Sequence, residues 1–321
     1  MPTTSLNRRE FLQVAGTAAS AAVVSACAAV PPPPTEPAYK LPRRSLGKTG
    51  VRLSVVGFGG IVVMNETPES ASQLVARAIE RDINYFDVAP SYGNAEERLG
   101  PALEPYRKTV FLACKTQQRT RAGAETELKR SLERLRTDHF DLYQFHAVTS
   151  MSDVETICGP AGALEAFREA REKGLIRHIG FSAHSEPAAL AMLDRFAFDT
   201  ILYPVNWVCW YGGNFGPRVV AKAAEQGLGI LALKSLARQR WPAGVARQWP
   251  KCWYQPVDTA EEAALGLRFT LAQPVTAAVC PSHAELLWMQ CDAAEQLAAL
   301  TPEEEARLRE RSAQLSPIFT A

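Results

Sequence analysis

Residues 109–146 read TVFLACKTQQRTRAGAETELKRSLERLRTDHFDLYQFH, and this stretch holds the pattern that decides the fold. Its two ends, Thr109–Lys115 and Phe140–His146, are short and largely apolar, as strands buried on both faces of a parallel sheet are. Between them, Ala122–Arg136 carries leucines on one helical face and charged residues elsewhere, which predicts an amphipathic helix. The stretch therefore predicts two parallel strands joined by a helix.

The same alternation recurs along the chain in both directions from this unit. Eight candidate strands are present: Leu53–Phe58, Ile83–Asp87, Thr109–Lys115, Phe140–His146, Ile176–Ser182, Thr200–Asn206, Ile230–Lys234 and Val275–Cys280. They recur at intervals of roughly 30 residues, which suits a (β/α)8 barrel of ~250 residues. The glycine-rich run Val56–Gly60 lacks the G-x-G-x-x-G spacing of a Rossmann unit. We therefore predict an α/β fold, a (β/α)8 TIM barrel forming a single domain over residues 41–321.

The composition excludes several classes of protein. Of 321 residues, 47% are hydrophobic and 21% are charged, as in ordinary globular domains, which argues against a disordered or fibrous chain. The 35 basic and 34 acidic residues nearly cancel, so we expect no nucleic-acid partner. The seven cysteines form no C-x-x-C pair and no metal-ligand spacing with the five histidines, so we expect no bound metal.

The first 26 residues have the layout of a signal peptide. Arg8 and Arg9 precede Phe11-Leu12, and Val14–Ala26 is a charge-free run of small residues, shorter than the ~20 apolar residues of a membrane span. The paired arginines predict the twin-arginine export machinery as a partner, a pathway that exports folded proteins. On this interpretation the mature protein is exported, and is periplasmic or envelope-anchored. The alternative is an ordinary exposed helix.

A cysteine and a proline-rich stretch follow the small-residue run. Val24-Ser25-Ala26-Cys27 resembles the lipobox of bacterial lipoproteins, in which Cys27 would be lipidated after cleavage and would anchor the protein to a membrane. Cleavage of a plain signal, with Cys27 incidental, is the alternative. Pro31–Pro37 is expected to form extended polyproline II chain of ~3 Å per residue. Residues 27–40 are therefore interpreted as a linker.

Polar side chains stand where three consecutive predicted strands end. Asp87 ends the second strand and Tyr92 follows it, while Lys115 ends the third strand and His146 the fourth. In a parallel barrel these ends meet at one mouth, where active sites are built. We therefore expect the four side chains to converge.

These four residue types suit the reduction of a carbonyl group. Tyrosine is a weak acid, with an ordinary pKa of about 10. An ammonium at ~4 Å attracts a phenolate by ~4 kcal/mol at an effective dielectric of ~20, so Lys115 would lower the pKa of Tyr92 until burial opposes it. Asp87 would keep Lys115 protonated, and His146 would hydrogen-bond the carbonyl oxygen. Each residue alone has a structural explanation, but together they predict a site with Tyr92 as general acid.

The chain resembles the aldo/keto reductases over residues 41–315. The motif Asp87-Val88-Ala89-Pro90-Ser91-Tyr92-Gly93 is highly specific, and Cys114-Lys115-Thr116 and Asp141–His146 resemble the family's third and fourth strands. The resemblance implies a catalytic tetrad of Asp87, Tyr92, Lys115 and His146. It also implies a small-molecule carbonyl substrate and an NAD or NADP cofactor lying extended across the barrel mouth.

The same resemblance implies a set of cofactor-binding positions. They are Ser182, Asn206, Lys234, Ser235, Leu236, Arg238, Arg240, Ser282 and His283. For Arg238 and Arg240 the equal alternative is that they are solvated surface charges. The chain departs from the family at Ala183, where an asparagine is usual, at Leu202, where a glutamine is usual, and at Ser235, which replaces a proline. No Lys or Arg occurs between Arg268 and Arg307, where the family grips the 2′-phosphate of NADP. We therefore expect at most a weak preference for NADP, with NAD at least competitive.

The sequence thus predicts an NAD(P)H-dependent oxidoreductase that reduces aldehydes or ketones to alcohols. The alternative is an exported, degenerate barrel that acts as a binding protein with little or no turnover. Tryptophans concentrate in two loops on the predicted catalytic face, at positions 207, 210, 241, 249 and 253. They line a substrate pocket on one interpretation, and simply pack the loops on the other.

Overall fold

The computed structural model describes residues 40–321. The predicted signal peptide, its arginine pair, Cys27 and all but the last residue of the predicted linker lie outside the described residues. Within residues 40–321, no helix combines the length and hydropathy that crossing a membrane requires.

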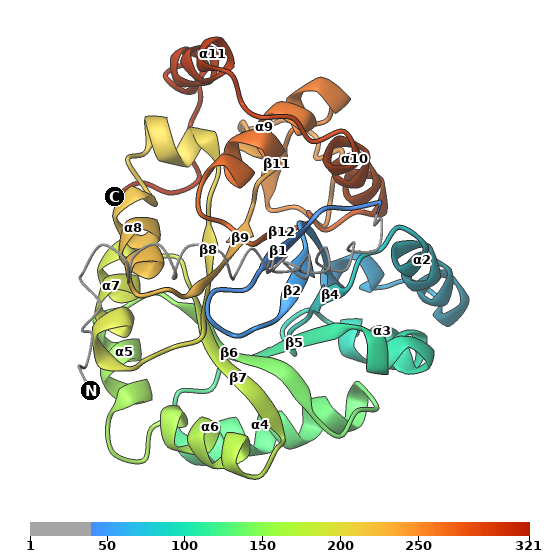
Figure 1. Cartoon of the computed structure of the whole chain (residues 1–321), viewed down its shortest axis with the longest axis vertical. Coiled ribbons are helices and arrows are strands. Elements are labelled where there is room, and N and C mark those ends of the chain that lie inside the picture. The colour runs from blue at the N-terminus through green and yellow to red at the C-terminus, as the bar shows by residue number, and fades with distance from the viewer. Residues whose placement is uncertain (1–39) are drawn as a thin grey trace, which may run out of the picture. The chain divides into compact units, whose positions relative to one another are not determined.

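Eight parallel strands close into a barrel, which confirms the predicted fold (Figure 1). Around the barrel the order is β12-β3-β4-β5-β6-β7-β8-β9, so each strand pairs with its neighbour in sequence except where the last meets the first. The barrel strands are β3 (Val56–Gly59), β4 (Tyr85–Asp87), β5 (Phe111–Thr116), β6 (Phe140–Val148), β7 (Ile176–Ala183), β8 (Thr200–Pro204), β9 (Gly229–Leu233) and β12 (Ala277–Val279).

The first predicted strand is two strands in the structure. Its beginning belongs to β2 (Arg52–Ser54), which pairs antiparallel with β1 (Arg43–Ser45) in a hairpin, and only its end belongs to β3. The hairpin lies across one end of the barrel in Figure 1, and Leu46 and Leu53 share a buried cluster with side chains of the barrel interior. The chain therefore closes one end of its barrel before the first barrel strand begins.

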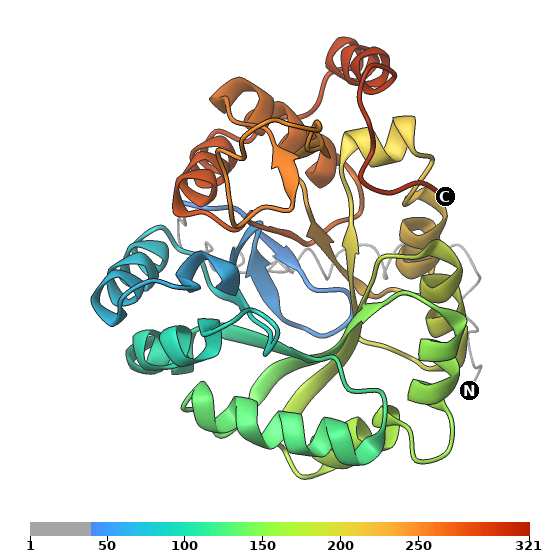
Figure 2. The same ribbon diagram turned by 180° about the vertical axis from the view of Figure 1, so that it is seen from behind.

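Helices surround the barrel (Figure 2). Most helices of the described residues begin at a side-chain cap. Ser or Thr caps α2, α4, α5, α7, α9 and α11, whereas α10 follows His283 with no side-chain cap. The helices are α2 (Pro68–Glu80), α3 (Ala95–Leu103), α4 (Arg121–Arg134), α5 (Met151–Cys158), α6 (Ala163–Glu172), α7 (Glu186–Arg195), α8 (Pro217–Glu225), α9 (Ala260–Ala272), α10 (Ala284–Glu295) and α11 (Pro302–Ser312), with short helical turns at Gly60–Val63, Glu104–Thr109 and Val208–Gly212.

A small ribbon interrupts the repeat after β9. Strands β10 (Ala237–Arg240) and β11 (Tyr254–Pro256) pair antiparallel, and the loop 241–253 joins them. Near the chain end, Arg240 binds the tail through Ser316 and Pro317. The ribbon and its loop contribute to the wall of the site described below, through Lys251, Trp253 and Tyr254.

Cysteines are part of the packed interior. The six cysteines of the described residues are free, and five are buried: Cys114, Cys209, Cys252, Cys280 and Cys291. Burial raises the pKa of each of these thiols. Cys158, at the end of α5, is partly exposed.

Candidate active site

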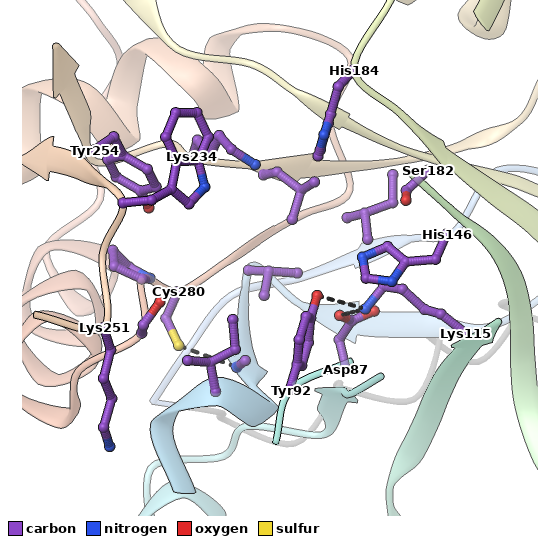
Figure 3. A pocket seen from close by; sticks show the side chains of 18 residues that line it. Asp87, Tyr92, Lys115, His146, Ser182, His184, Lys234, Lys251, Tyr254 and Cys280 are labelled. Carbon is purple, nitrogen blue, oxygen red and sulfur yellow. Dashed lines mark hydrogen bonds and ion pairs between the residues drawn. The ribbon is translucent and has the colours of Figure 1, made fainter. Parts of the chain in front are cut away.

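Lys115 joins the predicted tetrad. Its ammonium is bonded to the carboxylate of Asp87 and lies 3.4 Å from the hydroxyl oxygen of Tyr92, with a further contact to the Val88 carbonyl at 3.3 Å. The ring of His146 lies edge-on to that of Tyr92, with ring centroids 5.6 Å apart. The structure thus brings all four predicted residues together, as Figure 3 shows.

Two buried side chains that we did not predict hold Asp87. The hydroxyl of Tyr85 donates to the carboxylate at 3.2 Å, and the Gln144 amide nitrogen donates at 3.1 Å. Both stand two residues before a predicted site residue on the same strand, so both face the barrel interior with it. A polar residue at that spacing in an apolar strand is the signal that could have identified Gln144.

The ionisation of the tetrad differs in one respect from our expectation. Burial alone would lower the pKa of Lys115, but the adjacent Asp87 carboxylate opposes it and raises the pKa to about 12, so this lysine is charged. Burial raises the pKa of Tyr92, and Lys115 offsets only part of that rise. The expected net lowering of the Tyr92 pKa is therefore wrong, because desolvation of the phenolate outweighs the attraction of one ammonium. Tyr92 is fully protonated at neutral pH.

His146 is neutral. Burial lowers its pKa well below the ordinary value, and the positive charge of Lys115 adds to this effect. The hydroxyl oxygen of Ser91 lies 3.3 Å from its Nδ1. If Ser91 donates to Nδ1, the single imidazole proton lies on Nε2, which can then donate to a ligand.

A cavity of about 210 Å³ opens beside the tetrad. Of the nine predicted cofactor positions, Ser182, Lys234 and Ser282 line it, whereas the others do not. Because ligand pockets usually measure ~300–1,000 Å³, this cavity suits the reacting end of a ligand better than a whole dinucleotide.

The buried positions among the other six point into the protein. The side-chain oxygen of Asn206 accepts from the Cys209 amide at 2.9 Å. Ser235 is fully buried, and Leu236 packs in a cluster with Val257. For Ser235 and Leu236 the backbone at Lys234, whose φ of 63° turns the chain at the end of β9, accounts for this orientation.

The remaining positions are engaged elsewhere. Arg238 lies 3.7 Å from Glu262, and Arg240 donates to the Pro317 carbonyl. Nε2 of His283 accepts from the backbone amide of Lys251 at 3.1 Å, and burial lowers the His283 pKa. The two arginines therefore do not face the cavity in this structure.

A model of the aldo/keto reductase family matches residues 55–278 of the chain. The chain belongs to this family. Two curated relatives from Bacillus subtilis (strain 168) are the uncharacterized oxidoreductase YqkF, 34% identical over 155 residues, and the aldo-keto reductase YhdN, 32% identical over 181 residues. These matches cover 44% and 50% of this chain, and 48% and 52% of the relatives. The chain therefore spans about half the length of the curated relatives it matches.

A solved member of the family shares the fold. The chain is similar to the aldo-keto reductase AKR11C1 from Bacillus halodurans (holo form), with a TM-score of 0.68 and 24% identity. The similarity covers 88% of this chain and 98% of that one. This similarity shows that the two proteins share the fold over most of the barrel.

The cavity of this aldo/keto reductase fits a nicotinamide cofactor in part. Ser282 lines the cavity two residues before α10, whose first amides have no side-chain cap and can receive a phosphate. Ser182 also lines it, and its oxygen accepts from the Ala147 amide, which leaves the hydroxyl hydrogen free to donate. Leu202 lines the cavity where the family has a glutamine, so one polar contact is missing there.

The lining residues that were not predicted from the sequence include His184, Lys251 and Tyr254. Lys251 lies in the loop 241–253, and its ammonium contacts Glu66 at 3.0 Å and the Val62 carbonyl at 3.1 Å. Of the five loop tryptophans only Trp253 lines the cavity, and Trp207 is buried in a separate cluster. Both interpretations of the tryptophans thus apply, each to different residues.

Proposed function

We propose that this protein is an NAD(P)H-dependent reductase that converts the carbonyl of a small aldehyde or ketone into an alcohol. The observation that carries the proposal is the contact of Lys115 with both Asp87 and Tyr92 at the edge of a cavity. Membership of the aldo/keto reductase family supports it. A bound nicotinamide would supply the hydride.

The residues of the chain would supply the proton. Tyr92 carries a proton at neutral pH and donates it to the carbonyl oxygen as negative charge develops there. Lys115 stabilises the phenolate that remains, and Asp87 keeps Lys115 charged. His146 would donate from Nε2 and fix the position of the carbonyl oxygen. General acid catalysis of this kind contributes ~10²–10⁴-fold to a rate.

Titration of the purified protein with NADH and NADPH, followed by fluorescence, tests the proposal together with the reduction of an aromatic aldehyde. We expect saturable binding and turnover. Binding without turnover would instead support the degenerate barrel, an alternative favoured by Ala183 and Leu202, which cannot hydrogen-bond a carboxamide. Each missing hydrogen bond weakens binding by ~1 kcal/mol, which reduces affinity without abolishing it.

We also propose that NADPH is at most weakly preferred over NADH. Arg238 and Arg240 are engaged outside the cavity, and Lys251 is paired with Glu66. Two charge-assisted hydrogen bonds to a phosphate would provide ~10²–10⁴-fold of preference. Dissociation constants for both cofactors at one ionic strength decide the question, and a preference above ~100-fold for NADPH would contradict it.

Export by the twin-arginine route remains a proposal that rests on the sequence. Changing Arg8 and Arg9 together to lysine should retain the precursor inside the cell. Appearance of the double variant in the envelope fraction would show that this assignment is wrong.

A further inference from the structure

A second lysine, Lys234, lines the same cavity as the tetrad. It differs from Lys115 in having no counter-charge, because no carboxylate of the described residues lies within ion-pair distance of its ammonium. Its side chain is buried. Burying a charge without a partner is unfavourable, so a buried lysine without a counter-charge calls for a functional explanation.

His184 accompanies Lys234. It follows β7, lines the cavity, and its Nε2 is buried with no hydrogen-bond partner among the described residues. Burial lowers its pKa to about 3, and Lys234 adds to this effect, so the imidazole is neutral and can donate one hydrogen bond. Figure 3 shows Lys234 and His184 on the side of the cavity away from Tyr92 and Asp87.

Aromatic rings hold this pair in place. The Lys234 ammonium lies 5.7 Å from the ring centroids of both Trp253 and Phe319. The Phe319 ring also packs on the rings of His184 and Phe215, with centroids 5.2 Å apart in both pairs. Rings around an ammonium favour its charged form but leave its hydrogen-bond donors free.

We infer that Lys234 and His184 bind the carboxylate of the carbonyl substrate. A cation and a neutral donor converging on one cavity suit an anionic group, and the tetrad that would receive the carbonyl lines the same cavity. The same cavity of about 210 Å³ would also have to admit the nicotinamide, so it leaves room for only a short substrate between the two groups. The substrates are therefore small oxo acids, with an aldehyde or ketone at one end and a carboxylate at the other. This inference rests on the proposed reductase function.

The test compares 4-oxobutanoate with the uncharged aldehyde pentanal in wild-type enzyme and in Lys234→Met. We expect the wild type to prefer the acid, and the substitution to reduce the ratio of kcat/KM for acid over pentanal by ~10–100-fold, the value of one charge-assisted hydrogen bond. Lys129→Met, the same chemical change on the exposed face of α4, is the control and should leave the ratio unchanged. An unchanged ratio in Lys234→Met would overturn the inference.

A phosphate of the cofactor is the other anion that Lys234 could bind. The dissociation constants of NADH and NADPH for Lys234→Met show whether Lys234 binds the substrate carboxylate or a phosphate of the cofactor. A tenfold loss of cofactor affinity with an unchanged substrate ratio would assign Lys234 to the cofactor and overturn the inference.

A binding measurement separates failure of this inference from failure of the proposed function. Butanedioate carries a carboxylate but has no carbonyl that can be reduced. It should raise the Tm of the wild type and not that of Lys234→Met, even if no turnover occurs. His184→Phe should weaken this effect and His184→Gln, which keeps a donor, should restore part of it. Equal Tm shifts in wild type and Lys234→Met would contradict the carboxylate site.

Discussion

The ammonium of Lys115 contacts the hydroxyl of Tyr92 at 3.4 Å while it is bonded to the carboxylate of Asp87. The pKa of Tyr92 is nevertheless raised, because burial outweighs that contact. The lysine therefore does not prepare a phenolate in the resting protein. Its charge acts as the proton leaves, which is when stabilisation lowers a barrier.

Replacing the proton donor is the direct check of this arrangement. We expect Tyr92→Phe to reduce turnover of an aromatic aldehyde by at least ~10²-fold, because only the transferred proton is lost. The cofactor dissociation constant should stay nearly unchanged. Single-turnover kinetics and fluorescence titration measure the two effects. Turnover within about threefold of wild type would exclude Tyr92 as the acid.

The support of Asp87 is tested by removing the hydroxyl of Tyr85. Tyr85→Phe deletes a 3.2 Å hydrogen bond to the carboxylate. We expect kcat to fall by about tenfold or less, with little change in KM, since Tyr85 positions Asp87 and touches no ligand. Tyr143→Phe removes a buried hydroxyl that does not contact Asp87, and serves as the control. Equal effects of the two variants would indicate general damage to the barrel.

The activity on an oxo acid should depend on pH through Lys234. Burial lowers the pKa of Lys234 to about 8, so its positive charge is present below that pH and is lost above it. Lys115, with a pKa of about 12, is charged throughout this window, and His184, with a pKa of about 3, is neutral. The pKa values of Tyr92 and of nearby Cys209 are both raised, so neither group loses its proton before Lys234 does.

We therefore expect kcat/KM for 4-oxobutanoate to fall as the pH rises through about 8, while kcat/KM for pentanal stays level. A pH–rate profile for both substrates measures this. Parallel profiles would show that Lys234 does not contact the substrate.

The same lysine should reduce the stability of the fold. Its pKa is lower in the folded protein than in the unfolded chain, so the folded state binds the proton less tightly, and the cost is fully present below pH 8. Lys234→Met should raise the free energy of unfolding at pH 7 by roughly 2–4 kcal/mol. The difference in the free energy of unfolding between Lys234→Met and the wild type should shrink between pH 8 and about 10.5, because the wild type gains stability as Lys234 loses its proton. Denaturant unfolding of both proteins at pH 7 and pH 10 checks the sign.

The tetrad was predictable because it depends on local pattern and on one rule of parallel barrels. Asp87, Lys115 and His146 lie at or within two residues of the ends of their strands, and strand ends of a closed barrel meet at one mouth. Tyr85 and Gln144 follow the same two-residue periodicity, so their position in the barrel interior could also have been predicted from the sequence.

Residues beyond the strand ends were not predictable in this way. The positive φ of Lys234 turns Ser235 and Leu236 into the core, and no neighbouring glycine signalled that turn. His184 and Lys251 reach the cavity through loops whose paths are set by contacts distant in sequence, such as that of Lys251 with Glu66. The raised pKa of Tyr92 depends on burial, which requires the assembled barrel.

The buried cysteines bear on how such a protein could survive in an oxidising compartment. A chain that arrived there unfolded would expose every thiol of the barrel at once, and random disulfide bonds could then form faster than the barrel closes. In the folded barrel only Cys158 among the described cysteines is partly exposed, and the other five thiols are protonated and out of reach of an oxidant. If the chain is exported as proposed, folding before export would protect it from this chemistry, and alkylation of the native protein should label Cys158 well ahead of the other five described cysteines.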